Sequence, residues 1–285
     1  MTPERTHDAH EHEVHDHDRG LSFDVSTLMT RRRALQLFAI GGLTTVVGCG
    51  SSSGGSPSTT ASAPGSGSTA STDTATGGTA ETPEETGGPY PADGSNGINV
   101  LTESGIVRSD ITSSFGSASG TAAGVPLSIE LTILDVSEGG TPLEGAAVYL
   151  WQCDRDGAYS LYSAAIANEN YLRGVQESDA DGRVTFTSIY PAAYSGRWPH
   201  IHFEVYPSLD EATSAGTKLV TSQIALPEDA CRLVYATDGY EQSVQNLAQV
   251  SLATDNVFSD GYSTQLGTVS GSATEGMTVR LNVGV

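Results

Sequence analysis

The sequence is poor in basic residues and in apolar residues, and both shortages restrict what the protein does. Only 13 Lys and Arg residues stand against 34 Asp and Glu residues, which gives a formal net charge of −21. A chain this acidic has no sequence-wide means of neutralising phosphates, so we expect no nucleic-acid partner. The hydrophobic fraction is 37%, and 33 glycines indicate that part of the chain forms no packed core.

A long apolar run is also missing. A mostly apolar stretch, Leu35 to Val47, is well short of the roughly 20 residues that span a bilayer. It follows three arginines, residues 31–33, and such a pattern is typical of a twin-arginine export signal. The stretch ends at Val46-Val47-Gly48-Cys49, which resembles the lipobox of bacterial lipoproteins, where the cysteine is lipidated after cleavage.

We therefore interpret residues 1–49 as a signal segment, with Cys49 as the candidate lipidation site; a short buried helix is the alternative. Residues 50–89 are Gly, Ser, Thr, Ala or Pro except for four acidic residues, which predicts a disordered linker. Together they predict an exported, extracellular protein that is tethered to the outer face of the cell membrane. A linker that is only O-glycosylated is the alternative.

Residues 90–285 carry short alternating apolar segments separated by Gly, Pro and Asp. In the segment 127–134, for example, Leu127, Ile129, Leu131 and Ile133 fall on one face, as in a half-buried strand. This spacing predicts an all-β fold with an antiparallel β-sandwich core and long loops. Only residues 243–252 suggest a helix. The expected strands are 127–134, 147–153, 182–187, 200–206 and 277–283.

Histidine is scarce in this domain, because five of the seven histidines lie in the signal segment. The two that remain, His200 and His202, are spaced i and i+2 on an expected strand, so both imidazoles point to the same face. Such a pair can converge on one metal ion, although two ordinary surface histidines would show the same spacing.

Two tyrosines and an arginine flank the histidine pair. Tyr194 and Arg197 lie in a proline-bounded loop just before His200, and Tyr159 follows the strand 147–153. Phenolates are hard anionic ligands that suit a hard trivalent ion, and imidazole also suits iron. A bound cation deprotonates a tyrosine in spite of its solution pKa of about 10.

With these residues in place, the sequence resembles the intradiol ring-cleavage dioxygenases, and most closely a secreted actinobacterial branch of that family. The resemblance extends from about Gly88 to the C-terminus and is most specific over residues 142–206. The matching segments are Gly145–Asp154, Gly157–Ser160, Tyr171–Gln176, Asp179–Phe186 and Tyr194–His202. One departure is Ala192-Ala193, where the family usually has Pro-Gly.

The resemblance implies a non-haem Fe(III) site and insertion of O2 between the two hydroxylated carbons of a catechol-type substrate, giving a muconate-type diacid. It also implies that the iron ligands are Tyr159, Tyr194, His200 and His202, with Tyr194 and His202 axial and Tyr159 and His200 equatorial. A dissociating Tyr194 would accept a substrate proton. Arg197 would stabilise the electron-rich chelated ring.

Gln223 resembles the glutamine that the family places near the site, and an ordinary strand glutamine is the alternative. Catechol dioxygenases of this family carry an N-terminal helical dimerisation region. The signal and linker replace it here, so the oligomeric state stays open.

The two cysteines of the domain, Cys153 and Cys231, form a candidate disulfide if Cys49 is lipidated, since exported proteins keep disulfides. Two free buried thiols are the alternative. A rival interpretation joins both cysteines to His200 and His202 in a structural zinc site of a non-catalytic lipoprotein. Another makes the sandwich a carbohydrate- or lignin-binding module that stacks its ligand on Trp151 and Trp198.

Overall fold

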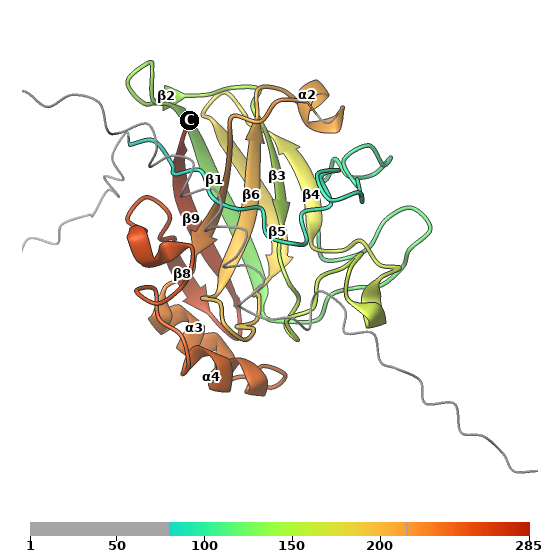
Figure 1. The fold of residues 1–285 in the computed structure, drawn as a ribbon, viewed down its shortest axis with the longest axis vertical. Helices are drawn as coiled ribbons and strands as arrows, with labels where there is room; N and C mark the ends of the chain where they lie inside the picture. Colours follow the sequence, from blue (N-terminus) through green and yellow to red (C-terminus); the bar gives the residue numbers. More distant parts are fainter. Residues whose placement is uncertain (1–79, 215) are drawn as a thin grey trace, which may run out of the picture. The chain divides into compact units, whose positions relative to one another are not determined.

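The computed structural model describes residues 80–214 and 216–285, and this part of the chain is built on two β-sheets (Figure 1). The signal segment and most of the expected linker lie outside the described residues. One sheet has five strands and the other has four. The strands are β1 (Pro126–Asp135), β2 (Thr141–Pro142), β3 (Ala147–Trp151), β4 (Arg173–Glu177), β5 (Arg183–Ile189), β6 (His200–Tyr206), β7 (Val220–Ala225), β8 (Thr268–Ser272) and β9 (Gly276–Gly284).

The five-stranded sheet is organised around β1. Strand β9 pairs with β1 along one edge, β5 and β2 pair with it along the other, and β8 extends the sheet beyond β9. The expected all-β sandwich is confirmed, with one difference: β1 and β9 run parallel. Parallel neighbours need a long crossover. Here residues 136–275 lie between the two strands.

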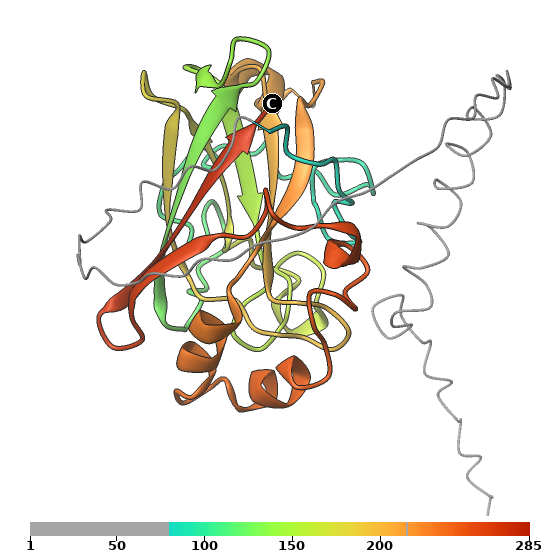
Figure 2. The same ribbon diagram turned by 90° about the vertical axis from the view of Figure 1, so that its left-hand side faces the viewer.

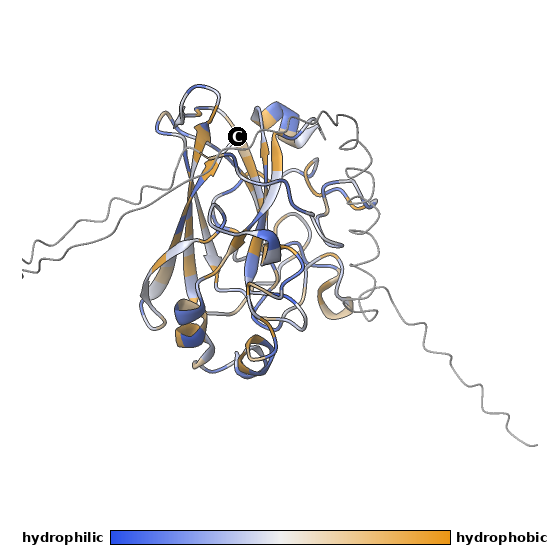
Figure 3. Cartoon of the chain, turned by 60° about the vertical axis from the view of Figure 1, so that its left-hand side comes forward, coloured by the Kyte–Doolittle hydropathy of each residue, from blue (hydrophilic) through white to orange (hydrophobic). Residues whose placement is uncertain are grey.

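The four-stranded sheet has the order β4-β3-β6-β7 and is antiparallel throughout. Its inner face packs on the five-stranded sheet, and the residues of β1, β6 and β9 that face this shared core are apolar (Figure 3). In β6, Ile201, Phe203 and Val205 are fully buried in the shared core. His200 and His202 therefore project from the opposite face of the same strand.

Short helices connect the later strands, and α3 and α4 lie together at one end of the sandwich (Figure 2). The helix suggested for residues 243–252 is confirmed in position, but it begins and ends earlier. The helices are η2 (Ala164–Ile166), α2 (Leu209–Thr213), α3 (Glu228–Tyr235), α4 (Glu241–Leu247) and η3 (Phe258–Asp260).

Residues 80–93, which we call the strap, cross the outer face of the four-stranded sheet (Figure 1). The backbone N–H of Thr82 donates to the Gly284 carbonyl at 2.9 Å, and that of Glu85 donates to the Thr221 carbonyl at 2.7 Å. At the far end, Lys218 bridges Asp93 of the strap and the buried Glu204 of β6.

The predicted linker boundary at residue 89 is therefore too late, because residues 80–89 belong to the folded unit. Their composition is that of a linker, but backbone groups of Thr82, Glu85 and Thr86 form hydrogen bonds with β7 and β9. No helix among residues 80–214 and 216–285 is long and apolar enough to cross a membrane.

Candidate metal centre

The two histidines of β6 are buried side by side on the outer face of the four-stranded sheet. Their Nε2 atoms lie 3.1 Å apart, and only 2% of His200 and 3% of His202 is exposed. Nδ1 of His200 is 2.5 Å from the Trp198 carbonyl oxygen. A carbonyl oxygen only accepts, so Nδ1 carries the proton and Nε2 keeps its lone pair.

Two tyrosines complete the cluster from separate loops. The Tyr194 hydroxyl is 3.1 Å from Nε2 of His200. The Tyr159 ring meets the Tyr194 ring edge-on at 6.0 Å and the His202 ring at 6.3 Å between centroids. The structure thus brings together all four residues that the sequence singled out as metal ligands.

The protonation states of the cluster follow from burial. Burial, followed by the charge of Arg197, holds the pKa of His200 well below its usual range. Burial also lowers the pKa of His202 and raises the pKa values of Tyr159 and Tyr194. Without a cation, the cluster consists of two neutral imidazoles and two neutral phenols.

The donor set fits a trivalent cation. The Tyr159 hydroxyl is buried and has no hydrogen-bond partner, which costs free energy unless a cation or another ligand satisfies it. Two phenolates would offset most of a 3+ charge, and two imidazoles add neutral nitrogen ligands. No group of three or more His, Cys, Asp or Glu side chains in the described part of the chain could hold a metal ion, so a metal at this site requires the tyrosines.

Strand register builds the floor of the site. Trp151 of β3, His202 of β6 and Gln223 of β7 are direct cross-strand neighbours, and Arg173 of β4 continues the same row. The indole of Trp151 stacks on the His202 ring, with centroids 4.8 Å apart and planes 5° apart. Sequence reasoning missed this role of Trp151, although the pairing of 147–153 with 200–206 would have suggested it.

Arg173 is a second residue that sequence reasoning missed. Only 1% of it is exposed, and its guanidinium donates to the carbonyls of Tyr90, Pro91 and Ser160, to the Ser160 hydroxyl and to Tyr149. These acceptors are all uncharged. Arg173 thereby ties the strap to the residue that follows Tyr159, and the Tyr90 ring packs on the Tyr159 ring at 4.8 Å.

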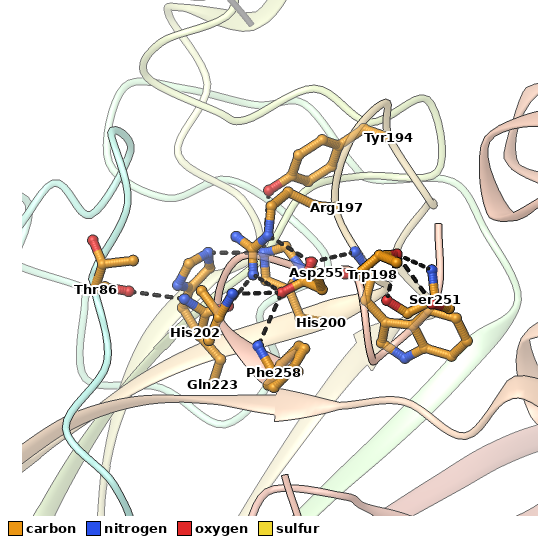
Figure 4. A network of polar contacts seen from close by, with 12 residues as sticks. Thr86, Tyr194, Arg197, Trp198, His200, His202, Gln223, Ser251, Asp255 and Phe258 are labelled. Atoms are coloured by element: carbon orange, nitrogen blue, oxygen red, sulfur yellow. Dashed lines mark hydrogen bonds and ion pairs between the residues drawn. The ribbon is translucent and has the colours of Figure 1, made fainter. Parts of the chain in front are cut away.

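Arg197 lies beside Tyr194, His200 and His202 in a network of polar contacts (Figure 4). Its Nη2 donates to Gln223 Oε1 at 2.7 Å, and Gln223 Nε2 donates to the Thr86 carbonyl of the strap at 2.8 Å. Gln223 therefore lies at the site, as the resemblance implied. The other partner of Arg197 is Asp255, which is fully buried and 2.9 Å from Nε. Nothing in the local sequence marked Asp255, because it lies in a loop 58 residues from Arg197.

The predicted disulfide is wrong, because Cys153 and Cys231 are both free. They belong to different hydrophobic clusters: Cys153 contacts the Ala192 carbonyl, and Cys231 contacts the Tyr190 hydroxyl. The zinc interpretation is not favoured either, since the described residues contain no group of cysteines and histidines that could hold a metal ion.

The carbohydrate-binding interpretation is not favoured, because both tryptophans that it needs as stacking surfaces are buried. Trp151 is fully buried under the strap side of the sheet, and only 3% of Trp198 is exposed. The indole N–H of Trp198 donates to the Leu226 carbonyl at 2.8 Å. Neither ring offers a face on which a sugar could stack.

The chain is similar to known dioxygenases in sequence and in fold. A curated relative, chlorocatechol 1,2-dioxygenase from Rhodococcus opacus, is 40% identical over 55 residues, which is 19% of this chain and 21% of the relative. An intradiol ring-cleavage dioxygenase from Tetranychus urticae has a similar fold, with a TM-score of 0.56 and 24% identity over 72% of this chain and 94% of that one.

A sequence profile for the family described as Dioxygenase matches residues 108–256. This range is more than half of the 285 residues and contains the four clustered ligand candidates together with Arg197, Gln223 and Asp255. The chain therefore belongs to this dioxygenase family, whose structural neighbours are intradiol ring-cleavage dioxygenases.

Proposed function

We propose that the protein is a non-haem Fe(III) dioxygenase that cleaves catechol-type aromatic diols between their hydroxylated carbons. Tyr159, Tyr194, His200 and His202 would hold the iron. One observation carries the proposal: two imidazole nitrogens and a phenol oxygen converge within 3.1 Å of their neighbours, beside a buried phenol without a partner. When bound, Fe(III) would supply a Lewis acid that chelates the diol and activates it toward O2.

The two tyrosines have different surroundings, which suits different tasks. Tyr159 is buried, packed against Tyr90, and fixed by the neighbouring contacts of Ser160. Tyr194 is partly exposed and lies in a loop. A diol sheds two protons when it chelates a metal, and the oxygen of the partly exposed Tyr194 is placed to accept one of them.

Arg197 supplies a fixed positive charge at the edge of the site. Its guanidinium has no free lone pair and stays protonated, so it is a poor metal ligand but a good partner for an electron-rich diolate. Gln223 holds Nη2 from one side, and through Thr86 it links Arg197 to the strap.

Oxygen incorporation tests this function. Iron-loaded protein is given catechol under ¹⁸O2, with 4-chlorocatechol in parallel because the curated relative is named for chlorocatechol. We expect a muconate-type diacid that carries two ¹⁸O atoms, one in each new carboxyl group. A product with one labelled atom, or no ring-opened product from either diol, would contradict the proposal.

We also propose that the protein is exported and held at the outer face of the cell membrane by a lipid on Cys49. The support is the sequence alone: an arginine triplet, a short apolar run and the Val46-Val47-Gly48-Cys49 segment. This location would place the enzyme among extracellular aromatic substrates.

A further inference from the structure

A single carboxylate, that of Asp255, organises the segment that leads into the metal centre. It is fully buried and accepts five N–H contacts. Oδ2 accepts from Arg197 Nε at 2.9 Å and from the Trp198 backbone N–H at 2.8 Å. Oδ1 accepts from the backbone N–H groups of Val257 and Phe258, and more distantly from Arg197 Nη2 at 3.4 Å.

These contacts connect the arginine with a histidine. Asp255 fixes the backbone of Trp198, and the carbonyl of Trp198 accepts from Nδ1 of His200. The carboxylate that holds the guanidinium therefore also holds the peptide that orients this imidazole (Figure 4). Residues that orient a metal-binding histidine in this way fix its tautomer and ring plane.

The buried positive charge of Arg197 also requires the negative charge of Asp255. A buried guanidinium without an anionic partner is costly, and Gln223, its other acceptor, is neutral. Among the residues that the structure describes, no hydrogen bond holds Nη1 of Arg197. Asp255 thus holds the guanidinium through Nε and Nη2.

We propose that Asp255 is a positioning residue that acts through Arg197: it immobilises the guanidinium at the distance and angle that the reaction needs. The proposal rests on the proposed dioxygenase function. It differs from a purely structural role, because a structural residue would affect the enzyme equally with and without Arg197.

A double-mutant cycle separates these two roles. Asp255→Asn keeps the size but replaces one acceptor oxygen by an NH2 group, which faces N–H donors. Turnover per bound iron is measured for wild type, Asp255→Asn, Arg197→Leu and the double variant. We expect Asp255→Asn to lower turnover roughly 10- to 100-fold when Arg197 is present, as for a misplaced catalytic group. When Asp255→Asn is added to Arg197→Leu, we expect turnover per bound iron to change by less than about 3-fold. The contact of Asp255 with the Trp198 peptide supports His200 as an iron ligand, so its loss should lower the iron content, which this ratio removes.

An equal loss of turnover in both backgrounds would overturn the proposal. Glu130→Gln is the matched control, since it removes the carboxylate partner of another arginine, Arg280, by the same chemical change on an exposed strand face. It should leave turnover per iron unchanged.

A second measurement needs no Asp255 variant and so remains informative if that variant does not fold. Gallium(III), a diamagnetic ion of the same charge, replaces iron in protein labelled with ¹⁵N-arginine. Hydrogen exchange of the Arg197 Nε–H, assigned by its loss in Arg197→Leu, is compared with that of exposed Arg183 and Arg232. We expect exchange at least about 100-fold slower at Arg197, as for a buried, bonded N–H.

Exchange at Arg197 as fast as at the two exposed arginines would overturn the proposal. The two proposals fail separately. If the iron-loaded wild type cleaves no diol, the proposed function is wrong, while the exchange measurement still decides whether the Arg197 Nε–H that Asp255 accepts is immobile.

Discussion

His200 and His202 have no substitute within the folded unit, because the other five histidines of the chain lie in the first 17 residues. Removing either imidazole, or the Tyr159 oxygen, removes one of four converging donors. We expect His200→Ala, His202→Ala and Tyr159→Phe each to lose most of the iron and the activity. The loss of iron affinity should exceed the roughly 10- to 100-fold typical of removing a residue that only orients a ligand.

Iron content by elemental analysis, together with turnover of catechol, checks this prediction. Tyr262→Phe is the control, since it makes the same chemical change at an exposed tyrosine outside the site. Two ligand variants with wild-type iron and turnover would show that the four-residue assignment is wrong.

Arg197 separates metal assembly from chemistry. It is not a metal donor, so Arg197→Leu should keep the iron and its colour while turnover falls by roughly 10²–10³-fold, as for the loss of one electrostatic stabiliser. The variant also leaves the Asp255 carboxylate buried without its partner, so its melting temperature should fall.

Arg197→Lys should restore turnover only in part, because a point charge cannot reproduce the two-sided contact with Asp255 and Gln223. Iron content, visible spectrum and turnover are compared among wild type, Leu and Lys variants. If the Leu variant loses its iron, Arg197 has a structural role in the loop and not a role in the reaction.

Much of this site could be predicted from the sequence, because four of its donors lie in one stretch of 44 residues, Tyr159 to His202. Asp255 could not be predicted, since a loop aspartate reaches Arg197 only through the tertiary fold. The role of Arg173 was hidden for a different reason: three of its five contacts are to backbone carbonyls, which no side-chain pattern reveals. The disulfide prediction was wrong because the spacing of Cys153 and Cys231 along the chain does not show that they lie in different hydrophobic clusters.

At the scale of elements, the strap matters most, because its composition predicted a linker although it forms hydrogen bonds with β7 and β9. A chain that begins at Gly87 loses the contacts that Thr82, Glu84, Glu85 and Thr86 make with β7 and β9. At about 1 kcal/mol for each hydrogen bond, the free energy of unfolding should fall by several kcal/mol. Turnover should also fall, because Gln223 loses its partner on the strap.

The comparison for this prediction is a chain that begins at Ala80 and keeps the whole strap. Urea unfolding and turnover are measured for both chains. Equal stability and turnover would show that residues 80–86 are a linker after all.

Because of Glu85 in the strap, the stability of the folded protein depends on pH. Burial, and next the charge of Asp260, raise its pKa from 4.5 to about 7. The folded protein therefore holds the Glu85 proton more tightly than the unfolded chain does. This group favours folding less as the pH rises from about 4.5 to about 7, and its effect is constant above that. Glu85 is half-buried, so solvent screening keeps the effect modest.

Glu85→Gln should remove this dependence. Relative to the Gln variant, the wild type should lose thermal stability between pH 5 and pH 8. Exposed Glu81→Gln serves as the control. A wild type that gains stability relative to the Gln variant over this range would contradict the assignment.

The five expected strands are confirmed as β1, β3, β5, β6 and β9. Strands β4 and β7 were missed because both carry polar residues at buried positions, such as Arg173 and Gln223, where the outer sheet face supports the site rather than solvent. Helix α3 was missed because eight residues are too few to establish a periodic pattern.

At the scale of the whole molecule, we propose that the N-terminal region determines where the protein acts. If Cys49 carries a lipid, the wild type should partition into detergent on Triton X-114 phase separation, and Cys49→Ser should move to the aqueous phase. Turnover per iron should be the same for both, because the catalytic unit does not include Cys49. Wild type that stays in the aqueous phase would contradict the anchor.

The central claim is that two tyrosines and two histidines of this chain hold Fe(III), and the visible spectrum of the purified, iron-loaded protein tests it most directly. Charge transfer from tyrosinate to Fe(III) absorbs visible light, so we expect a coloured protein with one iron per chain. Tyr194→Phe should weaken the band, and catechol added without O2 should shift it. A colourless protein, or one whose colour is unchanged in both Tyr159→Phe and Tyr194→Phe, would contradict the account.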